Sequence, residues 1–410
     1  MRHFQGGFEL KSRGSAYLEY ATGIFIACVF AGYPALALTA SVFGIDADNS
    51  RLVTVPFRGA MLTMSLVILA GSRLWIAGAR RPGAVLLGIF WSLYCLRILW
   101  ETVYHPDTLS IATEYLWSYA LGVCCVTNLP MLLPVSSTTQ QIAPRGIWGL
   151  ALYSSILSLL GNPTGVDLEQ RLTVSELLNP ISQGQSAVTL ILAAVYLALT
   201  ARGSLGFWVF AASALPGFYI VAAAGSRSPV LSLIGGLAIL SWWGRGIRMA
   251  NRLAVLGVGV SFVVSFGVSY LIARGSALTT RVEGTLAGIA SGEDMDRFSL
   301  WRMAWSQYLG SPIVGDGVEI FGVGYPHNLV IESLMVLGPL GLVIFLLIHL
   351  RAVRGLSLAV NAQGMAWLGA LAAQFFVLSM FTGGLYCSPE FWAALMGLLT
   401  ISDLGRRRPV

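Results

Sequence analysis

Arginine and histidine gather in one stretch of a chain that otherwise carries few charges. Arg297 and Arg302 lie beside tryptophans, and His327 follows a Pro-Ile-Val-Gly-Asp-Gly turn. Pro326 fits the first turn of a following helix, which would place His327 at a helix N-terminus, where positive charge is disfavoured. A neutral imidazole can accept a proton from a hydroxyl. The alternative is a histidine that only hydrogen-bonds its own loop.

A second arginine lies where two apolar runs meet. Ser226 or Ser228 can cap the helix that follows Arg227, and Pro229 fits its first turn. Backbone N–H groups and a guanidinium aimed at one place form an anion site. The alternative is an arginine that reaches the lipid headgroups.

The chemistry that these cations suit is the departure of a diphosphate. Metal-dependent enzymes neutralise such a leaving group with carboxylate-held Mg²⁺ or Mn²⁺, whereas here arginines are expected to neutralise it. One charge pair near 4 Å contributes ~4 kcal/mol at an effective dielectric of 20. Arg297 and Arg302 diverge by roughly 140° on a helix, so one phosphate is not expected to contact both. Arg171 adds further positive charge.

The composition is that of an integral membrane protein. Charged residues are 11% and hydrophobic residues 56%, and the mean hydropathy is +0.74, whereas soluble domains carry roughly 25% charged residues. The chain therefore faces membrane lipids. The net charge of +6 does not indicate nucleic acid, because the basic residues cluster in short loops.

We predict an all-α polytopic membrane protein with about twelve transmembrane helices, forming a single integral membrane domain over residues 1–410. The apolar runs are near 18–43, 58–78, 83–104, 112–133, 146–160, 185–201, 204–224, 228–244, 253–273, 327–350, 363–384 and 389–403. Alternate loops are basic or acidic, and basic loops mark the cytoplasm. Both termini are then cytoplasmic, and loops 161–184 and 274–326 are periplasmic.

The larger periplasmic loop is predicted to carry short helices at the membrane interface. Phe298, Trp301, Trp305 and Tyr308 fall on one helical face. Asp294 is the expected N-cap and Pro312 the expected stop. The motif region continues beyond the loop to residue 341.

The motif residues, taken in order, resemble those of the bacterial O-antigen ligases and O-antigen polymerases. The matching residues are Arg297, Leu300, Trp301, Pro312, Gly315, Gly317, His327, Asn328, Gly338 and Gly341. Ser226-Arg227 resembles a Ser-Arg at the start of a span, and Arg171 followed by Asn179-Pro180 resembles an upstream element. The resemblance covers roughly residues 171–350. Two departures are a short segment between Gly317 and His327, and Val174-Ser175 where glycine is often expected.

The resemblance implies a GT-C-like membrane glycosyltransferase of the bacterial inner membrane, with a periplasmic active site. Its donor would be an oligosaccharide on undecaprenyl diphosphate, and its acceptor a glycan or glycolipid. The catalytic residues would be His327 and Arg297, with Asn328 in support. Arg227, Arg302 and Arg171 would bind the diphosphate, without metal or cofactor.

Three functions stay open. Polymerisation of O-antigen or exopolysaccharide repeat units is favoured, with a chain-length regulator as a further partner. The first alternative is an O-antigen ligase that transfers glycan to lipid A–core. The more distant alternative is a lipid-linked glycan flippase or transporter, in which Arg73, Arg97 and Glu114 would line a pathway.

Overall fold

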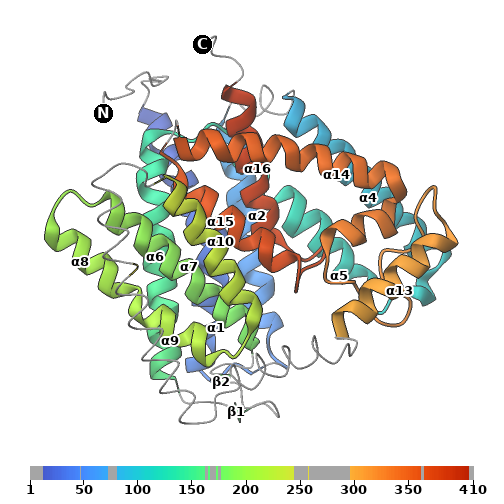
Figure 1. Ribbon diagram of the computed structural model, residues 1–410, viewed down its shortest axis with the longest axis horizontal. Coiled ribbons are helices and arrows are strands. Elements are labelled where there is room, and N and C mark those ends of the chain that lie inside the picture. The colour runs from blue at the N-terminus through green and yellow to red at the C-terminus, as the bar shows by residue number, and fades with distance from the viewer. Residues whose placement is uncertain are drawn as a thin grey trace.

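A computed structural model describes residues 13–46, 48–72, 81–161, 165–166, 172–173, 177–243, 257, 296–361 and 364–405. In these residues nearly every element is a helix (Figure 1). The first half contains α1 (Arg13–Val42), α2 (Arg51–Gly71), α4 (Pro82–Tyr104), η1 (Pro106–Thr108), α5 (Thr113–Trp117), η2 (Ser118–Val126), η3 (Leu129–Leu132), α6 (Ser137–Leu160) and α7 (Pro180–Thr200). The second half contains α8 (Ser204–Ser213), α9 (Leu215–Ala223), α10 (Arg227–Trp243), α13 (Asp296–Gly310), α14 (Leu329–Asn361), α15 (Ala366–Ser379) and α16 (Pro389–Gly405).

The predicted apolar runs and the observed helices agree. Each predicted run within the described residues coincides with one helix or with consecutive helical segments; the run at 253–273 lies outside them. By length and apolar composition, 7 of the described helices can cross a membrane. The chain is thus a multi-pass membrane protein, and the total of about twelve spans stays a prediction.

Helix α7 lies at the centre of the bundle. Its most apolar window is 89% buried, and α6, α9, α10 and α15 pack around it. A helix that is apolar on all sides is expected in such a position. Inside the bundle, Gln374 on α15 donates to the Gln185 carbonyl of α7 at 2.9 Å and to the Thr189 hydroxyl at 3.0 Å. Such hydrogen bonds between helices stabilise bundles in lipid.

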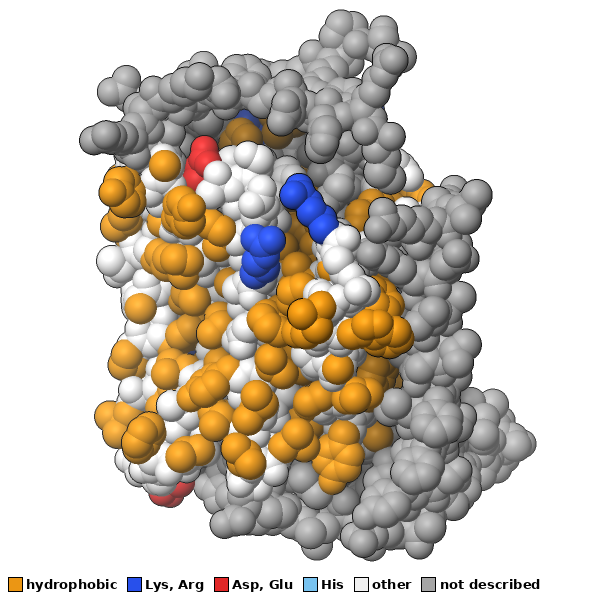
Figure 2. Space-filling model, turned by 90° about the vertical axis from the view of Figure 1, so that its left-hand side faces the viewer, with side chains coloured by type: hydrophobic (Ala, Val, Ile, Leu, Met, Phe, Trp, Pro, Cys, Tyr) orange, Lys and Arg blue, Asp and Glu red, His pale blue; other side chains and the backbone are white. Residues whose placement is uncertain are grey.

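The outer surface of the bundle is apolar where lipid would cover it. Figure 2 shows one face on which hydrophobic side chains spread over most of the described area, and charged side chains lie toward its upper and lower ends. Leu160, Leu205 and Trp208 are among the large apolar side chains that are exposed. Exposed apolar surface of this extent marks a face that contacts a membrane or a partner.

The two ends of the described chain lie on the same side of the bundle. In Figure 1, α1 begins and α16 ends at the top, whereas strands β1 (Gly165–Val166) and β2 (Leu172–Thr173) lie at the bottom. The strands pair antiparallel, with Gly165 opposite Thr173. This hairpin belongs to the predicted loop 161–184, so the arrangement agrees with termini on one side and that loop on the other.

Candidate active site

Helix α13 carries the first two arginines of the motif. It spans Asp296–Gly310, which confirms the helix expected from the aromatic residues, and Pro312 follows its end; Asp294 lies outside the described residues. Phe298 contacts Trp301 edge to face at 5.2 Å between ring centroids. Arg297 is half-buried and Arg302 is exposed, so the two side chains do occupy different sides of the helix.

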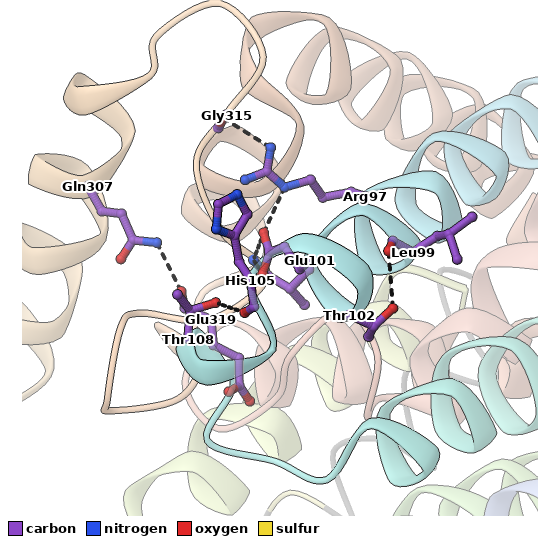
Figure 3. Close-up of polar contacts among 10 residues, drawn as sticks. Arg97, Leu99, Glu101, Thr102, His105, Thr108, Gln307, Gly315 and Glu319 are labelled. Carbon is purple, nitrogen blue, oxygen red and sulfur yellow. Dashed lines mark hydrogen bonds and ion pairs between the residues drawn. The ribbon is translucent and has the colours of Figure 1, made fainter.

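The turn after α13 is fixed by a pair of charged residues on α4 (Figure 3). Arg97 Nε lies 2.8 Å from Glu101 Oε1, and Arg97 Nη1 donates to the Gly315 carbonyl at 3.3 Å. Both carboxylate oxygens of Glu101 accept the Val318 N–H at 3.0 Å. We call Arg97 and Glu101 the brace. Because its arginine pairs with a carboxylate, the pathway role considered for Arg97 in a transporter finds no support.

A second carboxylate holds the same turn from the other side. Glu319 is buried, and its Oε2 accepts hydrogen bonds from the N–H and the hydroxyl of Ser110, both at 2.7 Å. The Tyr386 hydroxyl donates to Glu319 Oε1 at 3.2 Å. These contacts, together with Gln307 donating to the Glu319 carbonyl at 2.9 Å, immobilise the segment that leads to His327.

Two motif glycines are explained by a close contact between this turn and α14. Gly338 interrupts α14 with φ 65°, and a side chain there would meet the Ile313 carbonyl oxygen at 2.4 Å. Gly315 has φ 76°, and a side chain there would meet the Met335 carbonyl oxygen at 2.5 Å. Both positions combine a left-handed backbone with no room for a Cβ atom, which glycine alone tolerates.

The helix that follows His327 begins later than expected. Helix α14 starts at Leu329, so Pro326 does not lie in its first turn and that prediction is wrong. Asn328 caps the helix instead, since its Oδ1 accepts the N–H groups of Val330 at 3.1 Å and Ile331 at 3.2 Å. The helix thus begins with an asparagine cap and not with the expected proline. His327 directly precedes Asn328 and has φ 55°. Left-handed residues of this type cluster at functional sites.

His327 is half-buried and its two ring nitrogens differ. A hydrogen bond to the backbone of Thr382 raises its pKa, as expected for a ring N–H that donates to a carbonyl. Nδ1 is buried and has no hydrogen-bond partner among the described residues. Burial lowers the pKa below the usual 6.5, and the charge of Arg297 lowers it further. The imidazole is therefore neutral at pH 7, as expected, with burial as the largest cause.

Arg297 lies near His327 and near Arg227. Its guanidinium carbon is 5.9 Å from the centroid of the Phe381 ring, next to the Thr382 that contacts His327. Burial lowers the pKa of Arg297, and the charge of Arg227 lowers it further. Segments far apart in the sequence thus place Arg227 within electrostatic range of Arg297, and Arg297 within electrostatic range of His327. We call these three residues the cationic cluster.

Arg227 is the first residue of α10. Pro229 lies in the first turn of that helix, as predicted, and Gly225 precedes it with φ 60°. Ser226 and Ser228 are buried, with their hydroxyl oxygens 3.5 Å apart. Arg227 therefore lies at a helix N-terminus, where backbone N–H groups favour an anion.

Other residues singled out from the sequence lie elsewhere. Arg171 and Arg73 are outside the described residues, and Glu114 is exposed. Among the described residues, no group of three or more His, Cys, Asp or Glu side chains is arranged to hold a metal ion.

A cavity of about 390 Å³ adjoins the cationic cluster. Its wall contains Tyr325, whose ring centroid lies 4.6 Å from that of His327, and Thr382. Arg58 of α2 also lines it. Arg58 was not among the residues singled out from the sequence, although an arginine in an apolar run is a signal in itself.

One comparison with known proteins matches part of the chain. No curated protein matches the chain. Residues 210–346 match the Wzy_C family model, described as O-antigen ligase, and this segment contains Arg227, Arg297 and His327. The match shows that this segment is similar to the O-antigen ligase family, and at family level it supports the predicted superfamily of membrane glycosyltransferases, the O-antigen ligases and polymerases.

Proposed function

We propose that this protein transfers an oligosaccharide from undecaprenyl diphosphate to an acceptor glycan at the periplasmic face of the inner membrane. The observation that carries the proposal is the arrangement of the cationic cluster: Arg297 packs over Phe381, next to the Thr382 that contacts His327, and the charge of Arg227 acts on Arg297. Two like charges repel each other, so their proximity is favourable when an anion lies between them. A diphosphate is an anion of suitable charge for two guanidinium groups.

In this reaction the bond between the anomeric carbon and the diphosphate oxygen breaks. Negative charge grows on the departing oxygen, and Arg227 and Arg297 stabilise it. Donors aimed at developing charge contribute about 10²- to 10³-fold each. Arg302 and Arg171 are proposed as outer contacts of the diphosphate or of lipid phosphates, and the exposure of Arg302 suits this more distant position.

The acceptor hydroxyl forms the new bond to the anomeric carbon and loses its proton to His327. A neutral imidazole keeps a lone pair on the ring nitrogen that carries no proton, and this nitrogen of His327 is the proposed base. His327 lies just outside the capped end of α14, and this position ties the imidazole to a rigid element. No metal, cofactor or nucleotide sugar takes part in the proposed reaction.

Polymerisation of repeat units is the preferred form of this activity, and transfer to lipid A–core is the alternative. The short segment between Gly317 and His327 is tightly held by Glu101 and Glu319, which favours a small acceptor site. In a polymerase the acceptor is another lipid-linked unit, and a chain-length regulator would act on the product.

Surface glycans from a deletion strain, separated on a gel, test the proposal. Loss of a polymerase leaves single repeat units attached to lipid A–core, whereas loss of a ligase leaves undecaprenyl-linked chains. Repeat units trapped on the cytoplasmic side would instead establish a flippase and overturn the transferase. Complementation with His327→Gln should fail and complementation with His105→Gln should succeed, because His105 is exposed and outside the cluster.

A further inference from the structure

The cavity beside His327 contains a cation that the proposed reaction does not use. Arg58 lies two helical turns into α2, a helix long and apolar enough to span the membrane. Its guanidinium carbon stands 3.9 Å from the centroid of the Tyr119 ring and 5.7 Å from that of Tyr115. Arg58 Nη2 also donates a hydrogen bond to the Tyr119 hydroxyl. The two rings and the hydroxyl hold the guanidinium at the cavity wall.

An arginine within a membrane span needs a reason. Insertion of an arginine at a helix centre is unfavourable, so such residues face a partner or a water-filled cavity. Arg97 has Glu101 at 2.8 Å, whereas within the described part of the chain the side chains in contact with the Arg58 guanidinium are the uncharged rings of Tyr115 and Tyr119. Cation–π contacts compensate for this cost only in part. The site is therefore ready for an anion from outside.

The backbone around residue 119 supports a built site. Ser118–Val126 form a π-helix, which places Tyr119 on the cavity wall. Segments of π-helix are rare and often mark functional sites. Amide side chains of Asn179 and Gln185 and the carboxyl group of Glu390 line the same cavity, so hydrogen-bonding groups are present in its wall, and the rings of Tyr115 and Tyr119 contact the guanidinium itself.

Two neighbouring residues separate this cavity from the proposed diphosphate site. Phe381 lies under Arg297, whereas Thr382 lines the cavity and contacts His327. His327 therefore contacts a residue of the cavity wall, whereas the neighbouring Phe381 contacts Arg297. We assign Arg227 and Arg297 to a donor side of His327 and Arg58 to a cavity side. The hydroxyl that His327 activates belongs to the acceptor, so the acceptor is expected on the cavity side.

We propose that Arg58, held by Tyr115 and Tyr119, binds an anionic group on a sugar of the acceptor glycan. That the bound sugar belongs to the acceptor rests on the proposed function, whereas the binding of an anionic sugar by Arg58 does not depend on it. A planar guanidinium pairs with carboxylates and phosphates alike, so the group is the carboxylate of an acidic sugar or a sugar phosphate. A volume near 390 Å³ is within the range of small-ligand sites.

The test is calorimetric titration of the purified full chain in lipid nanodiscs. The probes are digalacturonate for a carboxylate, glucose 6-phosphate for a phosphate, maltose as the uncharged sugar and farnesyl diphosphate for the donor. Wild-type protein should bind one anionic sugar more tightly than maltose. Arg58→Gln should weaken that binding about tenfold or more, since hydrogen bonds to charged groups are strong, and should leave farnesyl diphosphate unchanged.

Matched variants separate binding from folding. Arg51→Gln removes an exposed arginine of the same helix and should bind every probe as the wild type does. Arg58→Lys keeps the charge without the planar fork, so it should lose part of the affinity and serves if the glutamine variant does not fold. The anionic sugar whose affinity falls identifies carboxylate or phosphate as the group.

Three results would overturn this inference. They are equal affinity of wild-type protein for anionic sugars and maltose, unchanged binding by the Arg58 variants, and loss of farnesyl diphosphate binding alone in Arg58→Gln. Failure of the proposed function has a different signature. Farnesyl diphosphate would then bind equally to wild type and Arg227→Gln, while the effect of Arg58 on anionic sugars persists.

Discussion

The brace and the cationic cluster use the same side chain for opposite purposes. Arg97 lies 2.8 Å from a carboxylate and donates to the backbone of the motif turn. Arg297, also half-buried, faces the Phe381 ring and the charge of Arg227. One arginine is neutralised by the protein, and the other is placed beside a second positive charge.

The difference shows which charges serve the fold and which serve a ligand. A buried pair that also satisfies backbone groups fixes a loop, and removing one partner leaves an uncompensated charge. Like charges held together raise the free energy of the empty site, which an anion then lowers. On this basis variants of the cluster should lose transfer with little change in stability, and variants of the brace should lose stability first.

The largest expected effect is on the base. His327→Ala should slow transfer by about 10²- to 10⁴-fold, the usual contribution of a positioned general base, with an unchanged melting temperature. The measurement is single-turnover transfer from a synthetic lipid-linked repeat unit by purified protein. Transfer at the wild-type rate would show that His327 only supports its loop. His105→Ala is the control.

The second effect concerns the leaving group. Arg297→Gln should lower the rate of transfer by about 10²- to 10³-fold, because one donor to the developing negative charge is lost. Binding of farnesyl diphosphate should weaken less than the rate falls. Arg354→Gln, an exposed arginine on α14, is the matched control. If Arg297→Gln loses stability but keeps the wild-type rate of transfer, Arg297 serves the fold, as the brace does.

The third prediction breaks the contact between the motif turn and α14. Gly338→Ala should reduce the free energy of unfolding by about 2–5 kcal/mol, from a left-handed alanine and from overpacking. Gly322→Ala is the control, since Gly322 has φ 73° and nothing within 4 Å of an added Cβ. The Gly322→Ala variant therefore has the free-energy cost of a left-handed alanine without the cost of overpacking. Equal melting temperatures for the two variants would argue against the contact with Ile313.

The fourth prediction weakens the brace. Glu101→Gln keeps the shape of the side chain and removes its charge, so Arg97 loses its ion pair and Val318 one of two carboxylate acceptors. The expected loss of stability is about 1.5–3 kcal/mol, measured by thermal unfolding in detergent. Asp107→Asn, an exposed carboxylate beyond α4, should melt as the wild type does. A stable but inactive Glu101 variant would contradict the structural role.

Local patterns predicted much of the fold. Apolar runs marked the helices because each must satisfy its backbone hydrogen bonds within lipid, and the spacing of Phe298, Trp301, Trp305 and Tyr308 marked α13. Pro229 marked the start of α10 correctly. The same rule misplaced the start of α14, because Asn328 caps that helix and Pro326 belongs to the turn before it.

Contacts between segments far apart in the chain could not be predicted from the sequence. Spacing could show that Arg297 and Arg302 diverge, but not that Arg297 meets Arg227 from another segment. Arg97 looked like a charge in a pathway until Glu101 and the Gly315 carbonyl were found beside it. Arg58 was missed because its aromatic partners lie some sixty positions away, on α5 and η2.

The smallest expected effect is a shift of the pH profile. His327 acts as a base when neutral, and burial and Arg297 lower its pKa below 6.5. The rate of transfer should therefore stay constant between pH 8 and pH 7 and fall only below about pH 6.5. Arg297→Gln removes a positive charge, so the pKa of His327 should rise and the acid limb should move to higher pH, by less than about one unit.

The ratio of transfer at pH 6 to transfer at pH 8, taken for each variant separately, measures this shift despite the lower rate. A lower ratio in Arg297→Gln than in wild type supports electrostatic contact between the two residues, and an equal or higher ratio would remove Arg297 from the surroundings of the base.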